Sequence, residues 1–244
     1  MNIFHKEKFK GDEKVLIHLL APYEPKFIAA VLPHVPRKIG TVHLTLMTII
    51  WSSSIILAGY FAKNDIRWLW LFSSCILFQY ITDMLDGAVG RMRNSGFIKW
   101  GFYMDHFLDY VFLFSIVIGY TWLLPESYWI LSVFCLAFCA GFMVHTLMDF
   151  SITNNFKISC SLFGVSEARI VLIIFNTILI VVGKGLLIQI FPFFVGMAFV
   201  ALCTVVYKSQ KIYAHLDVIQ QSTQEQNTSK NGGNVCEKPI MQNV

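Results

Sequence analysis

The sequence predicts an all-α membrane protein with about six transmembrane helices. Of its 244 residues, 56% are hydrophobic and only 14% are charged, which is more apolar surface than one soluble core requires. A helix needs roughly 20 mostly apolar residues to cross a bilayer, and polar clusters interrupt the stretch from Leu44 to Tyr207 at about that interval. The composition therefore excludes a disordered chain and an ordinary soluble domain.

Six apolar segments fit such spans. They are Leu44–Phe61, Trp68–Leu85, Phe102–Leu124, Tyr128–Phe150, Arg169–Val182 and Ile188–Tyr207. Ahead of them, prolines break the apolar blocks Val15–Leu20 and Phe27–Leu32, which favours an interfacial amphipathic helix over a seventh span. We thus expect an N-terminal segment over residues 1–36, a transmembrane domain over 37–210 and a polar, disordered tail over 211–244.

The basic residues predict the orientation in the membrane. If both termini are cytoplasmic, the cytoplasmic side holds all but three of the 19 Lys and Arg residues, the exceptions being Lys63, Arg67 and Lys184. This bias follows the positive-inside rule. The net charge of +4 is small and is spread between the apolar runs, so we expect no nucleic-acid partner.

Four aspartates form two in-phase pairs at the cytoplasmic ends of the second and third spans. Asp83 and Asp86 are spaced i, i+3, and Asp105 and Asp109 are spaced i, i+4, so each pair shares one helix face. The loop between the two spans is short, so the two faces can converge at one depth. Carboxylates there are costly unless they are paired, hydrated or bound to a cation, and hard divalent cations prefer such oxygen ligands. The register favours a metal site over a solvated set of ion pairs with Arg91, Arg93 and Lys99.

The run DMLDGAVGR, followed by GFYMDHFLD, resembles the signature of the CDP-alcohol phosphatidyltransferases, D-x2-D-G-x2-A-R-x8/9-G-x3-D-x3-D. The positions that match are Asp83, Asp86, Gly87, Arg91, Gly101, Asp105 and Asp109. One position departs, because Gly90 stands where alanine is usual. The segment HLTLM is similar to the N-x-L-T element of the first span, with Thr45 at the threonine and Val42 at the asparagine. FGVSEAR is similar to the G-P-T-E element of some members, with Glu167 in place and Val165 instead of the proline.

The resemblance implies an integral membrane enzyme of phospholipid biosynthesis. It would transfer a substituted phosphate group from a CDP-alcohol, with CDP-diacylglycerol as the first hypothesis, to the hydroxyl of an acceptor alcohol, and release CMP. Two Mg²⁺ or Mn²⁺ ions would be held by Asp83, Asp86, Asp105 and Asp109. Asp109 is also the implied general base, and the implied contacts to the CDP moiety are Gly87, Arg91 and Thr45. The active site would face the cytoplasm.

Two other functions stay open. One is a choline/ethanolamine-type phosphotransferase, which would use a CDP-linked headgroup and a lipid alcohol. The other is a divalent-cation transporter, although a transporter would more often place its acids near the midplane or in repeated halves. The expected partners are the two alcohol substrates and membrane lipids, and a homodimer is also left open.

Several further polar residues allow two interpretations. Arg169 and Lys157 could bind the phosphate of a phosphorylated acceptor, or could anchor lipid headgroups and enforce topology. His106 lies one position off the acidic face of the third span, and we expect it to pack rather than to bind a ligand. His145 and Asp149 could form an internal hydrogen bond or could reach an acceptor pocket.

Overall fold

A computed structural model describes residue 20, residues 22–153 and residues 165–232 of the chain. The described residues form helices and contain no strand. The chain divides into two compact units, Met1–Ala198 and Phe199–Val244. The first unit contains every residue of the predicted site.

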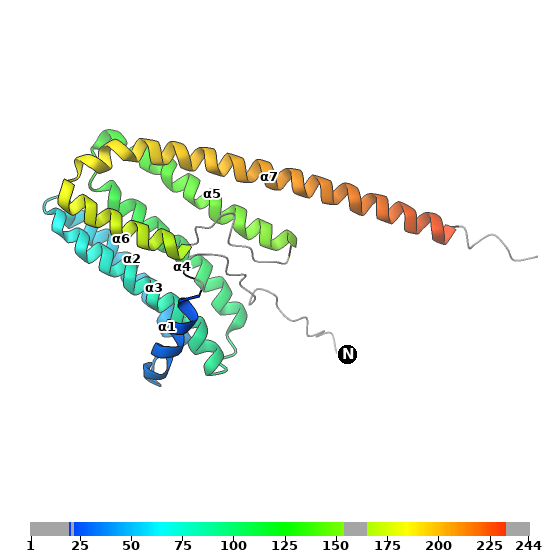
Figure 1. The fold of residues 1–244 in the computed structure, drawn as a ribbon, viewed down its shortest axis with the longest axis horizontal. Helices are drawn as coiled ribbons and strands as arrows, with labels where there is room; N and C mark the ends of the chain where they lie inside the picture. The colour runs from blue at the N-terminus through cyan, green and yellow to red at the C-terminus, as the bar shows by residue number, and fades with distance from the viewer. Residues whose placement is uncertain (1–19, 21, 154–164, 233–244) are drawn as a thin grey trace, which may run out of the picture. The chain divides into compact units, whose positions relative to one another are not determined.

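The helices follow one another along the chain (Figure 1), and residues 154–164, between α5 and α6, lie outside the described part. In order they are α1 (Glu24–Val31), the 3-10 turn η2 (Leu32–His34), α2 (Thr41–Ala62), η3 (Ile66–Trp68), α3 (Leu69–Met92), α4 (Ile98–Thr121), η4 (Glu126–Tyr128), α5 (Trp129–Thr153), α6 (Val165–Val182) and α7 (Gly185–Gly232).

Six of the described helical segments are long and apolar enough to cross a membrane, which confirms the predicted fold class. They are Thr41–Ala62, Ile66–Met92, Ile98–Thr121, Glu126–Ile152, Val165–Val182 and Gly185–Ile219. Most extend past the predicted spans, because hydropathy marks the apolar part of a helix whereas backbone hydrogen bonding continues through polar residues. Asp83 and Asp86 therefore lie within α3, which continues to Met92.

The helix α7 also continues where the sequence predicts a disordered tail from residue 211. It runs to Gly232, and residues 233–244 lie outside the described part of the chain. The Lys, Gln and Ala residues of this stretch have good helix propensity, and extension of an existing helix avoids the cost of nucleation. The low hydrophobicity of residues 211–232 indicates that they form no core of their own, but it does not determine whether their backbone is helical.

The helix α1 lies where the sequence predicts an interfacial helix. It includes the second apolar block up to Val31, and Leu32 begins η2. The first block, Val15–Leu20, lies outside the described residues except for Leu20. Pro25 falls in the first turn, where its missing N–H costs no hydrogen bond. No residue of α1 is buried.

Arg93, at the end of α3, fastens the segment between α1 and α2. Its guanidinium donates to the backbone carbonyls of Val35 and Pro36 at 3.1 Å, of Arg37 at 3.3 Å, and of Ile39. Side chains of the same segment pack against a small apolar cluster formed by Leu44, Leu85 and Val89. The segment is therefore held to both α2 and α3.

The helix α2 packs against both α3 and α4, and two glycines permit its close approach to α4. A Cβ added at Gly59 would overlap the backbone of Gly119, and a Cβ added at Gly119 would overlap the ring of Phe72. Small residues at such crossings let helix backbones meet in a membrane.

A buried polar link sets the register of α6 against α3 and α4. The Tyr120 hydroxyl donates to Asn176 Oδ1 at 2.6 Å, and Asn176 Nδ2 donates to Ser73 Oγ at 3.0 Å. Arg169 lies two turns before Asn176 on the same face of α6. The link therefore determines which part of α3 and α4 Arg169 meets.

We expect Gly59→Ala to destabilise the protein by about 1–3 kcal/mol, because the added methyl group must push the two backbones apart. The measurement is thermal unfolding of the purified protein in detergent. The matched control is Gly196→Ala in α7, where an added Cβ meets nothing within 4 Å. Equal unfolding temperatures for the two variants would contradict this account of the crossing.

Candidate active site

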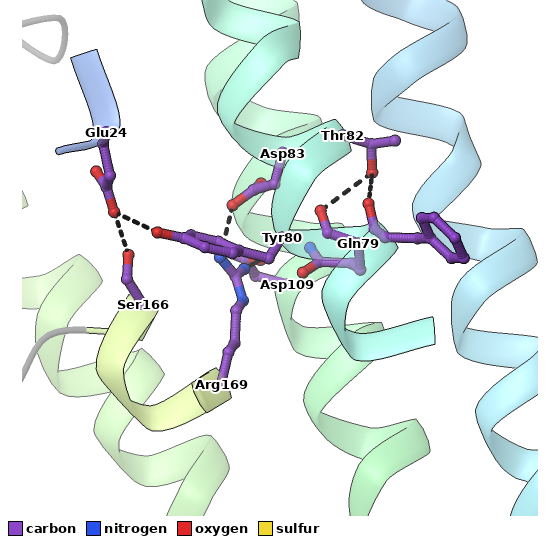
Figure 2. A network of polar contacts seen from close by, with 9 residues as sticks. Glu24, Gln79, Tyr80, Thr82, Asp83, Asp109, Ser166 and Arg169 are labelled. Carbon is purple, nitrogen blue, oxygen red and sulfur yellow. Dashed lines mark hydrogen bonds and ion pairs between the residues drawn. The ribbon is translucent and has the colours of Figure 1, made fainter. Parts of the chain in front are cut away.

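An arginine from α6 joins aspartates from α3 and α4. Arg169 Nη1 lies 3.0 Å from Asp83 Oδ2, and Nη2 lies 3.4 Å from Asp109 Oδ1 (Figure 2). The Arg169 side chain is 6% exposed, whereas those of Asp83 and Asp109 are 22% and 33% exposed. One acid from each predicted pair therefore meets at the same buried cation, so the two helix faces do converge.

Aromatic rings enclose the Arg169 guanidinium. Its Cζ lies 5.5 Å from the ring centroid of Tyr80 and 5.8 Å from that of Phe112. Such contacts stabilise a desolvated cation through the negative face of each ring. Asp105 also acts electrostatically on this guanidinium, so three of the four signature aspartates influence one positive charge.

Asp86, the fourth aspartate, is held from α2. Thr45 Oγ1 donates to Asp86 Oδ2 at 2.9 Å, and Thr41 Oγ1 donates to the Asp86 backbone carbonyl at 2.8 Å. Both threonines are buried. The sequence predicts Thr45 as a contact to the CDP moiety, and the structure places its hydroxyl on a signature carboxylate.

Two glycines in the signature segment, Gly87 and Gly90, adjoin polar side chains. An added Cβ at Gly87 would lie 3.4 Å from Arg91 Nη1, so the Arg91 guanidinium folds back over this glycine. An added Cβ at Gly90 would lie 2.7 Å from Thr41 Oγ1. The alanine usual in the signature would thus compete with the Thr41 hydroxyl for the same space, which explains the glycine at position 90.

The carboxylates provide the ligand chemistry of a hard divalent cation. Within residues 22–153 and 165–232, no three His, Cys, Asp or Glu side chains are grouped closely enough to hold a metal ion as they stand. Asp83, Asp105 and Asp109 nevertheless lie around the charge of Arg169, and all four aspartates carry the oxygen ligands that such ions prefer. The residues that could hold a metal are Asp83, Asp86, Asp105 and Asp109.

The remaining polar residues fall into different surroundings. His106 packs on Phe102, with ring centroids 4.3 Å apart, and its Nδ1 lies 2.7 Å from the Phe102 carbonyl oxygen. His145 and Asp149 lie half-buried on α5. Lys157 lies outside the described residues.

The role of Arg169 is the main result that the sequence did not predict. From the sequence, Arg169 could bind an acceptor phosphate or anchor lipid headgroups, and the aspartates could form ion pairs with Arg91, Arg93 and Lys99. In the structure Arg169 supplies ion pairs to Asp83 and Asp109. An arginine at the start of an apolar span was the available signal, since a charged residue at that depth requires a partner.

Comparison with known families agrees with the fold and the site. The structure defines the class of protein: an all-helical membrane protein with paired aspartates on two adjacent spans. The family model described as CDP-alcohol phosphatidyltransferase matches residues 34–207. The chain therefore belongs to the CDP-alcohol phosphatidyltransferase family. No curated protein and no solved structure shows detectable similarity to it.

This membership establishes the general activity. The protein is a phosphotransferase that acts on a CDP-alcohol and an acceptor alcohol. The family generally uses divalent metal ions. Because the chain belongs to an enzyme family, the intramembrane acids are not assigned to a divalent-cation transporter.

We expect Gly90→Ala to weaken the protein because the methyl group displaces the Thr41 hydroxyl, at a cost of about 1–3 kcal/mol. The double variant Thr41→Ala/Gly90→Ala should lose less stability than the two single variants lose together, because the Thr41 hydroxyl no longer occupies the space that the new methyl group needs. A double-mutant cycle on thermal unfolding and on CMP release measures this coupling. Additive effects would show that the two positions do not compete for space.

Proposed function

We propose that the enzyme uses CDP-diacylglycerol as its donor and transfers the phosphatidyl group to the hydroxyl of an acceptor alcohol, in phospholipid biosynthesis. Family membership supports transfer from a CDP-alcohol. The short chain resembles the phosphatidyltransferases, whereas Asp105-His106 and Glu167 resemble the choline/ethanolamine branch. The observation that carries the proposal is the convergence of Asp83 and Asp109 from different spans on Arg169. Their partly exposed carboxylates form an acidic centre on membrane helices, where a lipid-linked pyrophosphate can approach from the bilayer.

The proposed reaction needs a base and a phosphate-binding group from the chain. The acceptor oxygen forms a bond to the phosphorus that carries the diacylglycerol, and the bond from this phosphorus to the bridging oxygen breaks, so that CMP leaves. We assign Asp109 as the base that takes the hydroxyl proton. Arg91, which is exposed, offers a forked donor to the phosphates of CDP. Gly87 allows the close approach of this moiety, and Thr45 lies near its cytidine end.

Two Mg²⁺ or Mn²⁺ ions complete the proposal. Asp83 and Asp105 would contact both ions, Asp86 the first and Asp109 the second, by analogy with the family. When bound, the ions would neutralise the charge of the pyrophosphate and of the leaving phosphate. The chain's contribution is then to position the substrates and to accept the proton.

The site is proposed to face the cytoplasm. The distribution of basic residues supports this orientation, with Lys63, Arg67 and Lys184 on the opposite side. We divide the chain into an N-terminal segment over residues 1–36, a catalytic membrane domain over 37–210 and a polar tail over 211–244. Exposed Tyr23 and Phe27 suit an interfacial position of the N-terminal segment.

We expect CMP release from CDP-diacylglycerol, and not from CDP-ethanolamine, when the purified protein is given Mg²⁺ and a panel of water-soluble and lipid alcohols. Excess chelator should abolish the release, and added Mg²⁺ or Mn²⁺ should restore it. Turnover of CDP-ethanolamine with diacylglycerol would instead establish the choline/ethanolamine-type reaction. Full turnover after exhaustive metal removal would overturn the metal assignment.

The four aspartates should differ in what their loss removes. Asp83→Asn and Asp105→Asn should lose metal binding and activity together. Asp109→Asn keeps an oxygen ligand but loses the base, so donor binding should persist while turnover falls by ~10²–10⁴-fold or more. Donor binding and CMP release, measured side by side, separate the two outcomes.

A suitable control for this series is Asp65→Asn. Asp65 is exposed and caps η3, where its carboxylate accepts from the Arg67 N–H at 3.0 Å. The Asp65→Asn variant should retain normal turnover. If Asp109→Asn retains near-normal turnover, Asp109 is not the base; if it abolishes donor binding as completely as Asp83→Asn, Asp109 is a metal ligand alone.

A further inference from the structure

A polar tie connects α1 to α3 and α6 beside the aspartates. Glu24 Oε1 accepts hydrogen bonds from the Tyr80 hydroxyl at 2.8 Å and from Ser166 Oγ at 2.6 Å (Figure 2). A second contact lies close by in the sequence, where the Leu20 N–H donates to Glu167 Oε1 at 2.9 Å. Hydrogen bonds thus join the N-terminal side of α1, and Leu20 just before it, to α3 and α6.

Packing does little to hold α1 in this position. None of its residues is buried, and Phe27 is 40% exposed. The segment that follows α1 is different, because Arg93 holds its carbonyls and its side chains pack on an apolar cluster. The C-terminal side of α1 is therefore held through the segment that Arg93 and the apolar cluster fix, whereas its N-terminal side is held by polar contacts.

Tyr80 contacts both α1 and the acidic site. Its hydroxyl donates to Glu24, and its ring lies 5.5 Å from Cζ of Arg169. That guanidinium in turn bridges Asp83 and Asp109. One side chain therefore links a surface helix to the ion pairs of Asp83 and Asp109.

We propose that Tyr80 is a positioning residue and that its hydroxyl, with Glu24, forms a latch that holds α1 beside the site. The ring orients the Arg169 guanidinium between Asp83 and Asp109. When the latch opens, α1 swings about the segment fastened by Arg93, and access of the CDP-alcohol to the acids changes. This inference rests on the proposed function for the roles of the aspartates.

Hydrogen–deuterium exchange of residues 22–31 in nanodiscs tests the latch without any substrate. A hydrogen bond to a carboxylate shifts an opening equilibrium by roughly 10- to 100-fold, so Tyr80→Phe should accelerate exchange in α1 by that factor. Glu24→Ala also loses the contact to Ser166, so it should accelerate exchange at least as much. The double variant should exchange no faster than Glu24→Ala, since that change already removes the contact to Tyr80 together with the contact to Ser166. Unchanged exchange in either single variant, or additive effects, would overturn the latch.

Two control variants leave the latch intact. Tyr60→Phe removes a hydroxyl from an exposed tyrosine of α2 and keeps its ring contacts with Phe61 and Trp122. Glu126→Ala removes an exposed carboxylate from η4. Exchange in α1 should stay at the wild-type rate in both, and faster exchange in either would show that the assay reports general loosening, which would remove the support for the latch.

Steady-state kinetics separate the two roles of Tyr80, with whichever CDP-alcohol and acceptor turn over in the donor assay. Tyr80→Phe keeps the ring, so it should raise KM for the donor more than it lowers kcat. Tyr80→Leu also removes the ring from Arg169, so kcat should fall by a further factor of roughly 2–30. Equal kcat values for the Phe and Leu variants would overturn the positioning role.

The outcomes for the latch and for the proposed donor are distinguishable. If the enzyme turns over another CDP-alcohol but not CDP-diacylglycerol, the proposed donor is wrong. The exchange rates, and the comparison of Tyr80→Phe with Tyr80→Leu, still decide the role of Tyr80. If CDP-diacylglycerol is active and Glu24→Ala leaves both exchange and KM unchanged, the latch alone is wrong.

Discussion

The arrangement of this membrane domain depends on the charge balance around Arg169. A guanidinium and several carboxylates among membrane helices are costly to desolvate, and each is tolerated because the others are present. Asp83 and Asp109 meet Arg169 only when α3, α4 and α6 hold a particular register. The link from Tyr120 through Asn176 to Ser73 fixes that register in the apolar part of the bundle. Buried polar contacts between the helices thus position the acids of the site.

The helix α2 provides a second constraint, through residues outside the acidic signature. Thr45 holds the Asp86 carboxylate, and Thr41 holds the Asp86 backbone and fills the space next to Gly90. The departure of Gly90 from the usual alanine is therefore compensated within the same structure. A signature position is best interpreted together with the side chain that packs on it, because small residues in membrane helices commonly serve contact with a neighbour.

The N-terminal segment relates the membrane surface to the site. Arg93 and the apolar cluster around Val89 fasten one side of α1, whereas Glu24 holds the other side through Tyr80 and Ser166. An enzyme of this family brings together a CDP-alcohol and an acceptor alcohol in the setting of membrane lipids. A surface helix with an exposed apolar side chain such as Phe27 suits that setting.

The sequence by itself determined the properties that depend on local composition and spacing. Six spans follow from hydropathy, and the paired register of Asp83 with Asp86 and of Asp105 with Asp109 follows from helical periodicity. Helix ends and the helical state of residues 211–232 were missed, since hydropathy reports burial rather than backbone hydrogen bonding. Tertiary structure alone decided which partner each acid takes. Arg169 is 86 residues from Asp83 along the chain, and Glu24 is 56 residues from Tyr80; contacts at such separations are set by the packing of whole helices, which no local pattern encodes.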